Sequence, residues 1–583
     1  MSDVLKTQIL VVGGGTGGTA AAIQAARRGA QVTLVSEFPW LGGMLTSAGV
    51  SVPDGNELVA FQTGLWGAFL RELRQRQEGG LDHAWVSFFS FDPRLGARIL
   101  ADWVAELPNL RWIQGQRPRA VQRQGDRLTA VRFDHCTIEA DLILDATELG
   151  DLLALGDVDY RWGWEPQELW QEPSAPTQVQ LDGEPVCRRY PVQSPTWVVY
   201  LEDYGDQLAP PIVSPLAHPP SFDGSWGGWS DAQFLDYGRL PGGRFMLNWP
   251  GIGNDYGEGL DRLLGGDISR RTYGEEAIAH SLAFAAYVQQ RVGRRYGLAR
   301  GVFPDVAGPG GGALALHPYF RESRRLEALT TVTETDILPR AGARVAVLPL
   351  NDRGQVSAIA LGNYPNDHHY PGFDYRLAPK SLRWGGRWTG TPFTIPYEAL
   401  VPAAVDSLLA CEKNIGVSHM ANGATRLQPV VLGIGQAAGM AAALCVQRGC
   451  QPRDLPVREL QEALLGDPLA PAAVIPLFDA DPQRPDWLDL QRHYLDHPEA
   501  YADDGCHGGR IPALSPVDLP VLKGQFRRLG DQDYRLETSA GGWQLVTLRA
   551  EVNAALESLQ DGQRLTLQGR LNPAGNWLLV ESL

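Results

Sequence analysis

The chain has 583 residues, too many for one hydrophobic core, so we expect two or more domains. Hydrophobic residues make up 44% and charged residues 20%, which is typical of a folded globular protein and excludes a disordered one. The net charge of −16 repels phosphate backbones and argues against nucleic acid as the main ligand. The six cysteines are scattered without a CxxC spacing and no signal peptide is visible, so we expect a cytoplasmic protein.

Residues 8–37 predict a strand, a glycine turn, a helix and a second strand. Gly13, Gly15 and Gly18 stand at GxGxxG spacing, in which the glycines allow a tight turn, close approach to a pyrophosphate and close helix packing. The helix N-terminus then faces the pyrophosphate. Glu37 lies 19 residues after Gly18, where an acid accepts the ribose hydroxyls and disfavours a 2′-phosphate. The predicted dinucleotide-binding residues here are Gly13, Gly15, Thr16, Gly17, Gly18 and Glu37; this motif leaves FAD and NAD open.

A glycine pair follows the acid at once, in "WLGGMLTSAG". Many FAD enzymes carry such a pair at this place, packed against the pyrophosphate and the ribityl chain, although a plain turn is the alternative. The pair therefore favours FAD over NAD. The residues that we expect to contact it are Gly42, Gly43 and Met44.

Residues 141–144 predict another strand, which ends in "DATELGD". This segment resembles the "ATG" that flavoproteins of the glutathione-reductase-like class carry where the chain returns beneath FAD. Ala146 and Thr147 match the pattern and are candidate FAD contacts, whereas Glu148 stands in place of the glycine.

The stretch from 161 to 250 is rich in proline, glycine and aromatic residues and precedes a predicted helix near 274–294. We interpret this stretch as the start of an inserted substrate or cap domain. Its tryptophans either line a pocket for a bulky substrate or fill an irregular core. Seven of the 17 tryptophans lie here: Trp162, Trp164, Trp170, Trp197, Trp226, Trp229 and Trp249.

Two later segments carry residues suited to substrate binding. In "HPYFRESRRLEA", a strand would place Arg321 with Ser323 and Arg325 on one face, and Arg324 with Glu322 on the other. Arginines at such a place suit carboxylate recognition, and a salt-bridged strand is the alternative. In "NYPNDHHY", His369 is a candidate pocket residue. His368 and His369 lack a third ligand at a sensible spacing, so we expect no metal site.

The segment 418–446, "SHMANGATRLQPVVLGIGQAAGMAAALCV", joins a polar loop to an apolar helix rich in small residues. Val430 to Val446 is slightly too short for a bilayer and Gln436 interrupts it, so we expect a buried core helix and no membrane span. Pro429 suits the first turn of that helix because a proline lacks the N–H that would stay unpaired there. His419 is a candidate for catalysis or for cofactor support, and the sequence does not separate these roles.

The last 128 residues divide into two parts. Residues 456–515 are rich in proline and aspartate and are interpreted as a connector. Residues 516–583 alternate apolar and polar residues between turns, which predicts a small antiparallel β-barrel or sheet of four to six strands. Its arginines are balanced by acids, so we expect it to pack on the chain or to dock a protein partner rather than nucleic acid.

Taken together, "GGGTGG", "WLGGMLTSAG", "DATELGDLL", "PYFRESRRL", "PFTIPYEALVP" and the segment 418–444 resemble the FAD-dependent oxidoreductase family. That family is distantly related to the flavoprotein subunits of fumarate reductase and succinate dehydrogenase. The resemblance covers about residues 6 to 455. It implies an α/β fold: a Rossmann-like FAD-binding domain of the glutathione-reductase type, an inserted α+β substrate or cap domain, and a small all-β domain at the C-terminus.

The resemblance implies domain limits as well. The FAD-binding domain would comprise residues 6–160 and 395–455, with the substrate domain at 161–394. Residues 38–49 contain no histidine, so the covalent attachment known in the fumarate reductase branch is excluded there and noncovalent FAD is expected. The helix after Pro429 would point its N-terminus at the flavin, where it stabilises negative charge on the reduced ring. The expected contacts in this third strip are Asn422, Thr425, Arg426, Gln428, Pro429 and Val430.

The predicted activity is the transfer of a hydride or electrons between FAD and a small organic substrate. His419 and Arg321 would handle protons and orient the substrate, with Arg324 in support and His369 in the pocket. Two alternatives remain at this point: a flavin oxidase or monooxygenase that uses O₂, and a flavin-binding protein that docks a partner through its C-terminal β domain.

Overall fold

The computed structural model describes residues 3–508, 519–539 and 541–583. Its centre is a seven-stranded sheet in the order β3-β2-β1-β6-β5-β4, with β17 paired to β6. The pairs β3–β2, β2–β1, β1–β6 and β6–β17 are parallel, whereas β4 and β5 are antiparallel. These strands are β1 (Asp3–Val12), β2 (Val32–Ser36), β3 (Leu110–Gln114), β4 (Pro118–Gln124), β5 (Arg127–Phe133), β6 (Cys136–Asp145) and β17 (Leu408–Ala410).

The expected strand, glycine turn and helix at the N-terminus are β1 and α1 (Thr16–Arg27). Helix α12 (Gln428–Arg448) packs along α1, where Gly435 meets Gly17 and Gly439 meets Ala21 with no room for a Cβ atom. Among the described residues, α12 alone is long and apolar enough to cross a membrane, and 89% of its most apolar window is buried inside the protein. Small residues therefore let two helix backbones touch beside the sheet.

Further helices cover this sheet and extend the same core. Helices α13 and α14 lie within residues 456–508, which we expected to be a connector, and Leu460, Phe478 and Leu490 from this stretch belong to the main hydrophobic core. The two amphipathic helices were not predicted because the stretch is rich in proline. Residues 509–515 of the expected connector lie outside the described residues. The helices are α2 (Gly64–Arg76), α3 (Pro93–Ala105), α4 (Asp151–Leu155), α10 (Glu334–Ile337), α11 (His419–Thr425), α13 (Val457–Leu465) and α14 (Trp487–Asp496).

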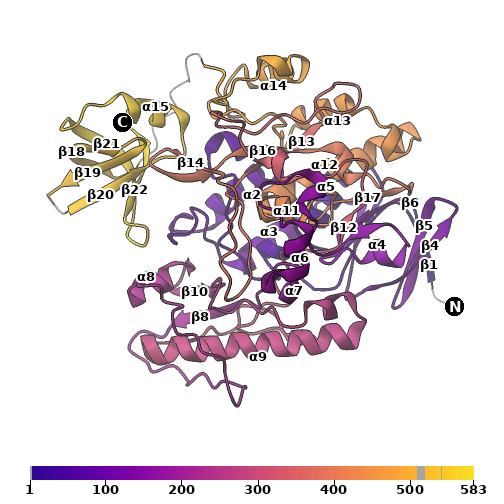
Figure 1. Ribbon diagram of the computed structural model, residues 1–583, viewed down its shortest axis with the longest axis horizontal. Helices are drawn as coiled ribbons and strands as arrows, with labels where there is room; N and C mark the ends of the chain where they lie inside the picture. The colour runs from indigo at the N-terminus through magenta and orange to yellow at the C-terminus, as the bar shows by residue number, and fades with distance from the viewer. Residues whose placement is uncertain (1–2, 509–518, 540) are drawn as a thin grey trace.

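A second layer holds a four-stranded sheet in the order β11-β8-β10-β9, with the long helix α9 beside it (Figure 1). The predicted helix 274–294 is α9, which begins earlier, at Asp267, and ends at Val292. Most of the tryptophans singled out above are at least partly buried, and Trp226 and Trp249 stack with Phe234 in a small separate core. The elements are α5 (Gln167–Trp170), α6 (Gln178–Gly183), α7 (Pro185–Arg189), α8 (Asp231–Asp236), α9, β8 (Val199–Asp203), β9 (Arg239–Leu240), β10 (Arg244–Leu247) and β11 (Tyr296–Leu298).

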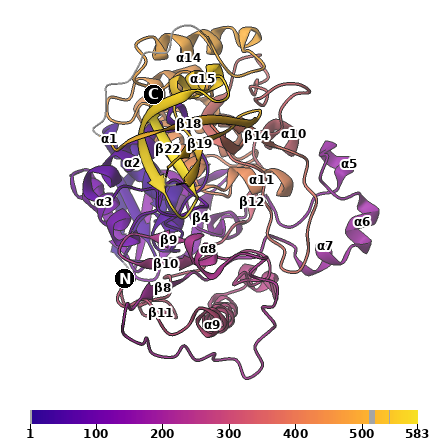
Figure 2. The same ribbon diagram turned by 90° about the vertical axis from the view of Figure 1, so that its left-hand side faces the viewer.

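The C-terminal residues form a closed barrel in the order β18-β19-β20-β22-β21, which projects to the left of the rest of the chain in Figure 1 and faces the viewer in Figure 2. The pairing of β20 with β22 is parallel, so the barrel is not wholly antiparallel as expected. Helix α15 between β20 and β21 lets the chain cross to reach that position. The elements are β18 (Val521–Gly530), β19 (Asp533–Thr538), β20 (Gly541–Val546), α15 (Ala550–Ser558), β21 (Arg564–Asn572) and β22 (Trp577–Ser582).

Short strand pairs connect these bodies. The hairpin β14–β15 contacts the barrel, because Thr547 N donates to Gly385 O at 2.8 Å and Gln544 Nε2 donates to Gly386 O at 2.6 Å. The hairpin also contacts β13, since Asn363 and Thr389 share a hydrogen bond of 3.1 Å. The elements are β7 (Tyr160–Arg161), β12 (Arg325–Leu326), β13 (Ala358–Asn363), β14 (Ser381–Trp384), β15 (Arg387–Gly390) and β16 (Pro392–Pro396).

Candidate functional site

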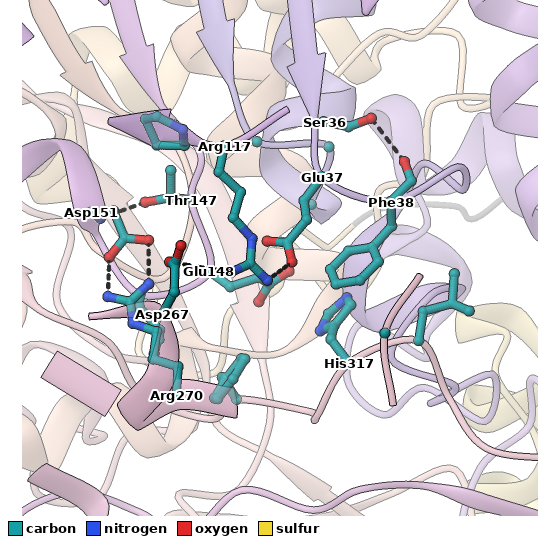
Figure 3. A pocket seen from close by; sticks show the side chains of 18 of the residues that line it. Ser36, Glu37, Phe38, Arg117, Thr147, Glu148, Asp151, Asp267, Arg270 and His317 are labelled. Atoms are coloured by element: carbon teal, nitrogen blue, oxygen red, sulfur yellow. Dashed lines mark hydrogen bonds and ion pairs between the residues drawn. The ribbon is translucent and has the colours of Figure 1, made fainter. Parts of the chain in front are cut away.

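A cavity of about 1370 Å³ opens at the carboxyl ends of β1, β2 and β6, the edge at which parallel sheets of this kind bind ligands. Figure 3 shows the rings of Phe38 and His317 on one side of it, the Asp151–Arg270 pair on the other, and Glu148 between them. Its length brings together residues from the glycine turn, from β2, from α9 and from the loop that contains His317.

The middle of the cavity is a cradle of bare backbone. Gly13 has φ +115°, which favours glycine, and Gly15 is the N-cap of α1 without a side-chain cap. A Cβ on Gly43 would lie 2.7 Å from Gly15 Cα, so the two turns touch. Uncapped N–H groups at a helix start attract anions, so this cradle suits a pyrophosphate.

One end of the cavity is charged. The guanidinium of Arg117 pairs with Glu37, the acid expected to hold a ribose. Arg270 and Arg324 both pair with Asp151, at 2.6 and 3.1 Å. Although burial acts against it, Arg270 and Arg324 hold the pKa of Asp151 below its ordinary value. This end can therefore bind a nucleoside through hydroxyl and backbone contacts.

The other end is aromatic. The rings of Phe38 and His317 stack with their centroids 4.9 Å apart, and His317 Nε2 lies 3.0 Å from Ser47 Oγ. Trp197 and Phe320 line the wall nearby. Flat apolar walls with a few polar atoms suit a ring system.

A buried ionic cluster lies directly behind the glycine cradle. Lys413 Nζ contacts Glu148 Oε2 at 2.7 Å and Glu412 Oε1 at 3.2 Å, and Glu412 Oε2 accepts a hydrogen bond of 2.7 Å from Gly17 N. Burial raises the pKa of Glu412 to about 7, against the attraction of Lys413. Burial also acts on Glu148, but Lys413 and His317 hold its pKa below the ordinary value.

A second cluster surrounds Arg321. Its guanidinium lies 3.1 Å from Asp255 Oδ1, and His369 bridges Asp255 Oδ2 at 2.7 Å and Asp367 Oδ2 at 2.8 Å. Because a carboxylate only accepts hydrogen bonds, each ring nitrogen of His369 must carry a hydrogen when both acids are ionised. Arg426 contacts Asp367 at 3.3 Å. Although burial opposes it, His369 and Arg426 hold the pKa of Asp367 well below its ordinary range.

This second cluster, which we call the arginine–histidine cluster (Asp255, Arg321, Asp367, His369 and Arg426), has unsatisfied donors. Nε of Arg321 and Nε of Arg426 are buried without a hydrogen-bond partner among the described residues. The side chains of Arg321 and Arg426 are at most 2% exposed, whereas that of Asp367 is 41% exposed. Buried donors of this kind need an acceptor, which a water or a bound polar molecule supplies.

His419 belongs to a third network. Its Nδ1 lies 2.8 Å from Glu322 Oε1, its Nε2 lies 2.5 Å from Tyr370 OH, and Trp164 covers its ring. Arg325 pairs with Glu322, so the two face each other, contrary to the strand expectation that put Glu322 with Arg324. Of this segment only Arg325–Leu326 is a strand, and Arg321 and Arg324 before it belong to different clusters.

The predicted site residues thus separate into groups. Those on the wall of the large cavity are Gly13, Gly15, Glu37, Gly43, Ala146, Thr147 and Arg324. Those outside this wall, although buried or close to it, are Thr16, Gly17, Gly18, Gly42, Met44, Arg321, His369, His419, Asn422, Thr425, Arg426, Gln428, Pro429 and Val430. Of the third strip, Arg426 joins the arginine–histidine cluster, and Asn422 Oδ1 accepts from Gln193 at 2.9 Å.

Several residues at these sites escaped the sequence analysis. Glu412 and Lys413 follow the apolar strand β17, and charged residues directly after a buried parallel strand are a signal that was available. Asp255 carries no comparable signal, because only the folding of residues 161–394 brings it to His369. Arg117 directly precedes β4, and no motif marked its side chain as a site residue.

Comparison with known proteins identifies the family to which the chain belongs. Residues 8–464 match the family model described as FAD dependent oxidoreductase. No curated protein matches the chain. Solved structures that match part of the chain include thioredoxin reductase of T. acidophilum (18% identity, 24% of this chain and 34% of that chain, TM-score 0.16) and L-proline dehydrogenase of P.horikoshii (17%, 28% and 25%, 0.16). Another is THI4 of Thermovibrio ammonificans (16%, 28% and 67%, TM-score 0.22).

The match covers 34% of thioredoxin reductase and 25% of proline dehydrogenase, and it reaches 67% of THI4. At such low identities they carry no information on substrate. The family model, by contrast, spans most of this chain, including the glycine turn, the cavity walls and α12. The chain is a member of the FAD dependent oxidoreductase family, and FAD is its cofactor.

Proposed function

We propose that this protein binds FAD noncovalently in the large cavity and passes a hydride or electrons between it and a small polar organic substrate. The residues present fit the cofactor. The glycine cradle, Glu37 and the rings of Phe38 and His317 line the same cavity, and the Asp151–Arg270 pair lies across from the two rings (Figure 3). FAD, when bound, supplies the transfer of hydride or electrons. Residues 6–160 and 395–455 would form the binding domain, and 161–394 the substrate domain.

One observation carries the assignment of the substrate region. The loop that begins at His317 lines the aromatic end of the cavity, and a few residues later the same loop places Arg321 in the arginine–histidine cluster. A substrate held by that cluster would therefore adjoin the ring end of the cofactor cavity. The unpartnered Nε atoms of Arg321 and Arg426 favour a substrate that carries oxygen acceptors.

The residues of this cluster would divide the work. Arg321 and Arg426 orient the substrate, and Tyr319 lies between them, with Arg321 Cζ 4.8 Å from its ring centre. His369 holds a proton between Asp255 and Asp367. The exposed part of Asp367 offers that proton a route to solvent.

His419 and Arg324 would serve as supports rather than contacts to substrate. Both ring nitrogens of His419 are occupied, by Glu322 and by Tyr370, so we propose that it holds the start of α11. Arg324 donates to Leu149 O at 2.8 Å and braces Asp151, which places it at the cofactor cavity.

We propose that the main role of the barrel is to pack on the rest of this chain, rather than to dock a protein partner. Asp82 of the main body accepts from Asn572 Nδ2 at 2.6 Å and from Trp577 Nε1 at 3.0 Å, and the hairpin β14–β15 is bonded to β20. These contacts support a role in holding the hairpin against β13, from which the chain continues to Asp367.

The test begins with the absorbance spectrum of the purified protein before and after acid precipitation. Flavin bands that pass into the supernatant are expected, and a colourless protein after reconstitution with FAD would refute the proposal. A panel of anaerobic donors then identifies a reductant for the bound flavin. With that donor, Arg321→Lys and His369→Gln should slow flavin reduction at least tenfold, whereas His419→Gln should lower thermal stability more than the reduction rate. Equal effects of all three would contradict the division of roles. Slow reoxidation in air is expected for a dehydrogenase or reductase.

A further inference from the structure

Two carboxylates flank the glycine cradle at the place that suits the pyrophosphate. A Cβ atom on Gly15 would meet Glu412 Oε2 at 2.7 Å and Glu148 Oε1 at 3.1 Å. A Cβ on Gly43 would meet Glu148 Oε1 at 2.8 Å. The carboxylates therefore occupy the space next to both turns, and one of them, Glu148, lines the cavity itself.

The cluster is short of positive charge. Lys413 is fully buried between the two acids and is their shared partner, so two negative groups and one positive group face a ligand that carries two negative charges. Glu412 Oε2 also takes the hydrogen bond of Gly17 N, one of the groups at the start of α1 that would otherwise attract the ligand. Glu148 Oε1 is buried without a hydrogen-bond partner in the described part of the chain.

Among the described residues, Lys413 is the one cation that forms ion pairs with these two acids. From the loop at the aromatic end, His317 attracts Glu148. After β6, Asp145 accepts from Thr147 N at 3.0 Å, and Asp151 is paired with Arg270 and Arg324. After β17, Cys411 precedes Glu412, and Asn414 Oδ1 accepts from Glu412 N at 3.2 Å. The unbalanced negative charge thus stays on the pair Glu148 and Glu412.

We propose that Glu148, Lys413 and Glu412 are positioning residues for FAD that act as one proton-linked unit, the two carboxylates holding one proton between them when the pyrophosphate is bound. The proton removes the excess negative charge next to the phosphates. If it lies on Glu148, the unpartnered Oε1 becomes a hydrogen-bond donor; if it lies on Glu412, Glu148 faces a neutral carboxyl group. The inference rests on noncovalent FAD, which is part of the proposed function.

The sign of the pH dependence follows from the cluster. Burial raises the pKa of Glu412 to about 7, so the free protein loses this proton as the pH rises through neutrality. A negative ligand binds the protonated form better. FAD should therefore bind tightest below pH 7, and its Kd should rise by up to about tenfold per pH unit above that, the limit for one linked proton.

The experiment is a titration of the apoprotein with FAD between pH 6 and pH 9, followed by flavin fluorescence. At pH 8, calorimetry in two buffers of different ionisation enthalpy counts the protons taken up. The wild type should take up close to one proton, and Glu412→Gln should take up none and show a flat Kd. Glu148→Gln is the second variant, with the same expectation, in case Glu412→Gln does not fold by circular dichroism. ADP-ribose, which has the pyrophosphate without the flavin, should reproduce the pH dependence.

Two control variants separate this cluster from other buried acids. Asp145 also has a pKa raised by burial to about 7, so Asp145→Asn must keep the proton uptake of the wild type. Glu334→Gln, a buried acid away from the cavity, must do the same. Two outcomes would overturn this inference but not the proposed function. One is FAD binding without proton uptake, and the other is uptake that is lost in Asp145→Asn and kept in Glu412→Gln. Failure of the wild type to bind FAD at any pH would instead overturn noncovalent binding.

Discussion

The contact between α1 and α12 allows a sharp test of how packing supports the cofactor site. At the crossing, a Cβ on Gly435 would lie 2.1 Å from Gly17 O and 2.7 Å from Gly17 Cα, whereas ordinary contacts begin at 3.4 Å. Gly435→Ala therefore requires the two backbones to separate by about 1 Å, and overpacking of this kind costs about 1–3 kcal/mol. The substitution also gains about 1 kcal/mol of helix propensity. The net loss should be about 0–2 kcal/mol.

The same helix offers a matched control. A Cβ on Gly433 would meet only Ala360 Cβ, at 3.2 Å, so Gly433→Ala keeps the propensity gain with little clash. Thermal unfolding of both apoproteins should give a lower midpoint for Gly435→Ala than for Gly433→Ala. Because α1 begins at the glycine cradle, Gly435→Ala should also weaken FAD binding. A Gly435→Ala protein as stable as the control, with unchanged FAD affinity, would refute the reasoning.

Three further predictions follow from individual ion pairs and hydrogen bonds. Asp255→Asn leaves Arg321 buried without its carboxylate and should cost about 3 kcal/mol of stability, measured by urea unfolding; a loss below about 1 kcal/mol would show that the pair is not buried as described. Arg117→Ala frees Glu37 and should weaken FAD binding by about two- to fivefold, the range of an exposed ion pair, while Glu37→Ala should weaken it more. Burial raises the pKa of Asp82 to about 6, so the folded state favours its protonated form, and that stabilisation is lost as the pH rises from about 4 through 6. Relative to the wild type, Asp82→Asn should therefore gain about 1–3 kcal/mol across that window and nothing more above it, as thermal unfolding at several pH values would show.

The local patterns of the chain predicted the strand, glycine turn and helix at the N-terminus and the buried helix α12. Three patterns depend only on residues close together in the chain: the GxGxxG spacing, the strands on either side of it and the small residues of α12. Such local patterns can be recognised from the sequence alone. The mixed α/β fold with a parallel sheet, the membership of the family and FAD were predicted in this way and are confirmed. The roles of the site residues stay predictions.

Long-range packing decided which charges meet. Arg321 and Arg324 are three residues apart, and one joins Asp255 while the other joins Asp151. An extended segment was expected to place these two arginines on opposite faces, but it was also expected to place Glu322 away from Arg325, and the two form an ion pair. Residues 456–508 likewise read as a connector, since the apolar faces of α13 and α14 become evident only against the core that covers them.

The sequence by itself determined the glycine turn and the helix that follows it, on which we predict that the dinucleotide binds, with Glu37 as the predicted ribose contact. It did not determine the charge that surrounds the pyrophosphate. Glu148 and Lys413 are 265 residues apart and meet because β6 and β17 are adjacent parallel strands whose carboxyl ends share one edge of the sheet. Only the tertiary structure decides which distant charges come into contact. Electrostatic interaction depends on distance in space and on burial, and the order of residues along the chain does not give either quantity.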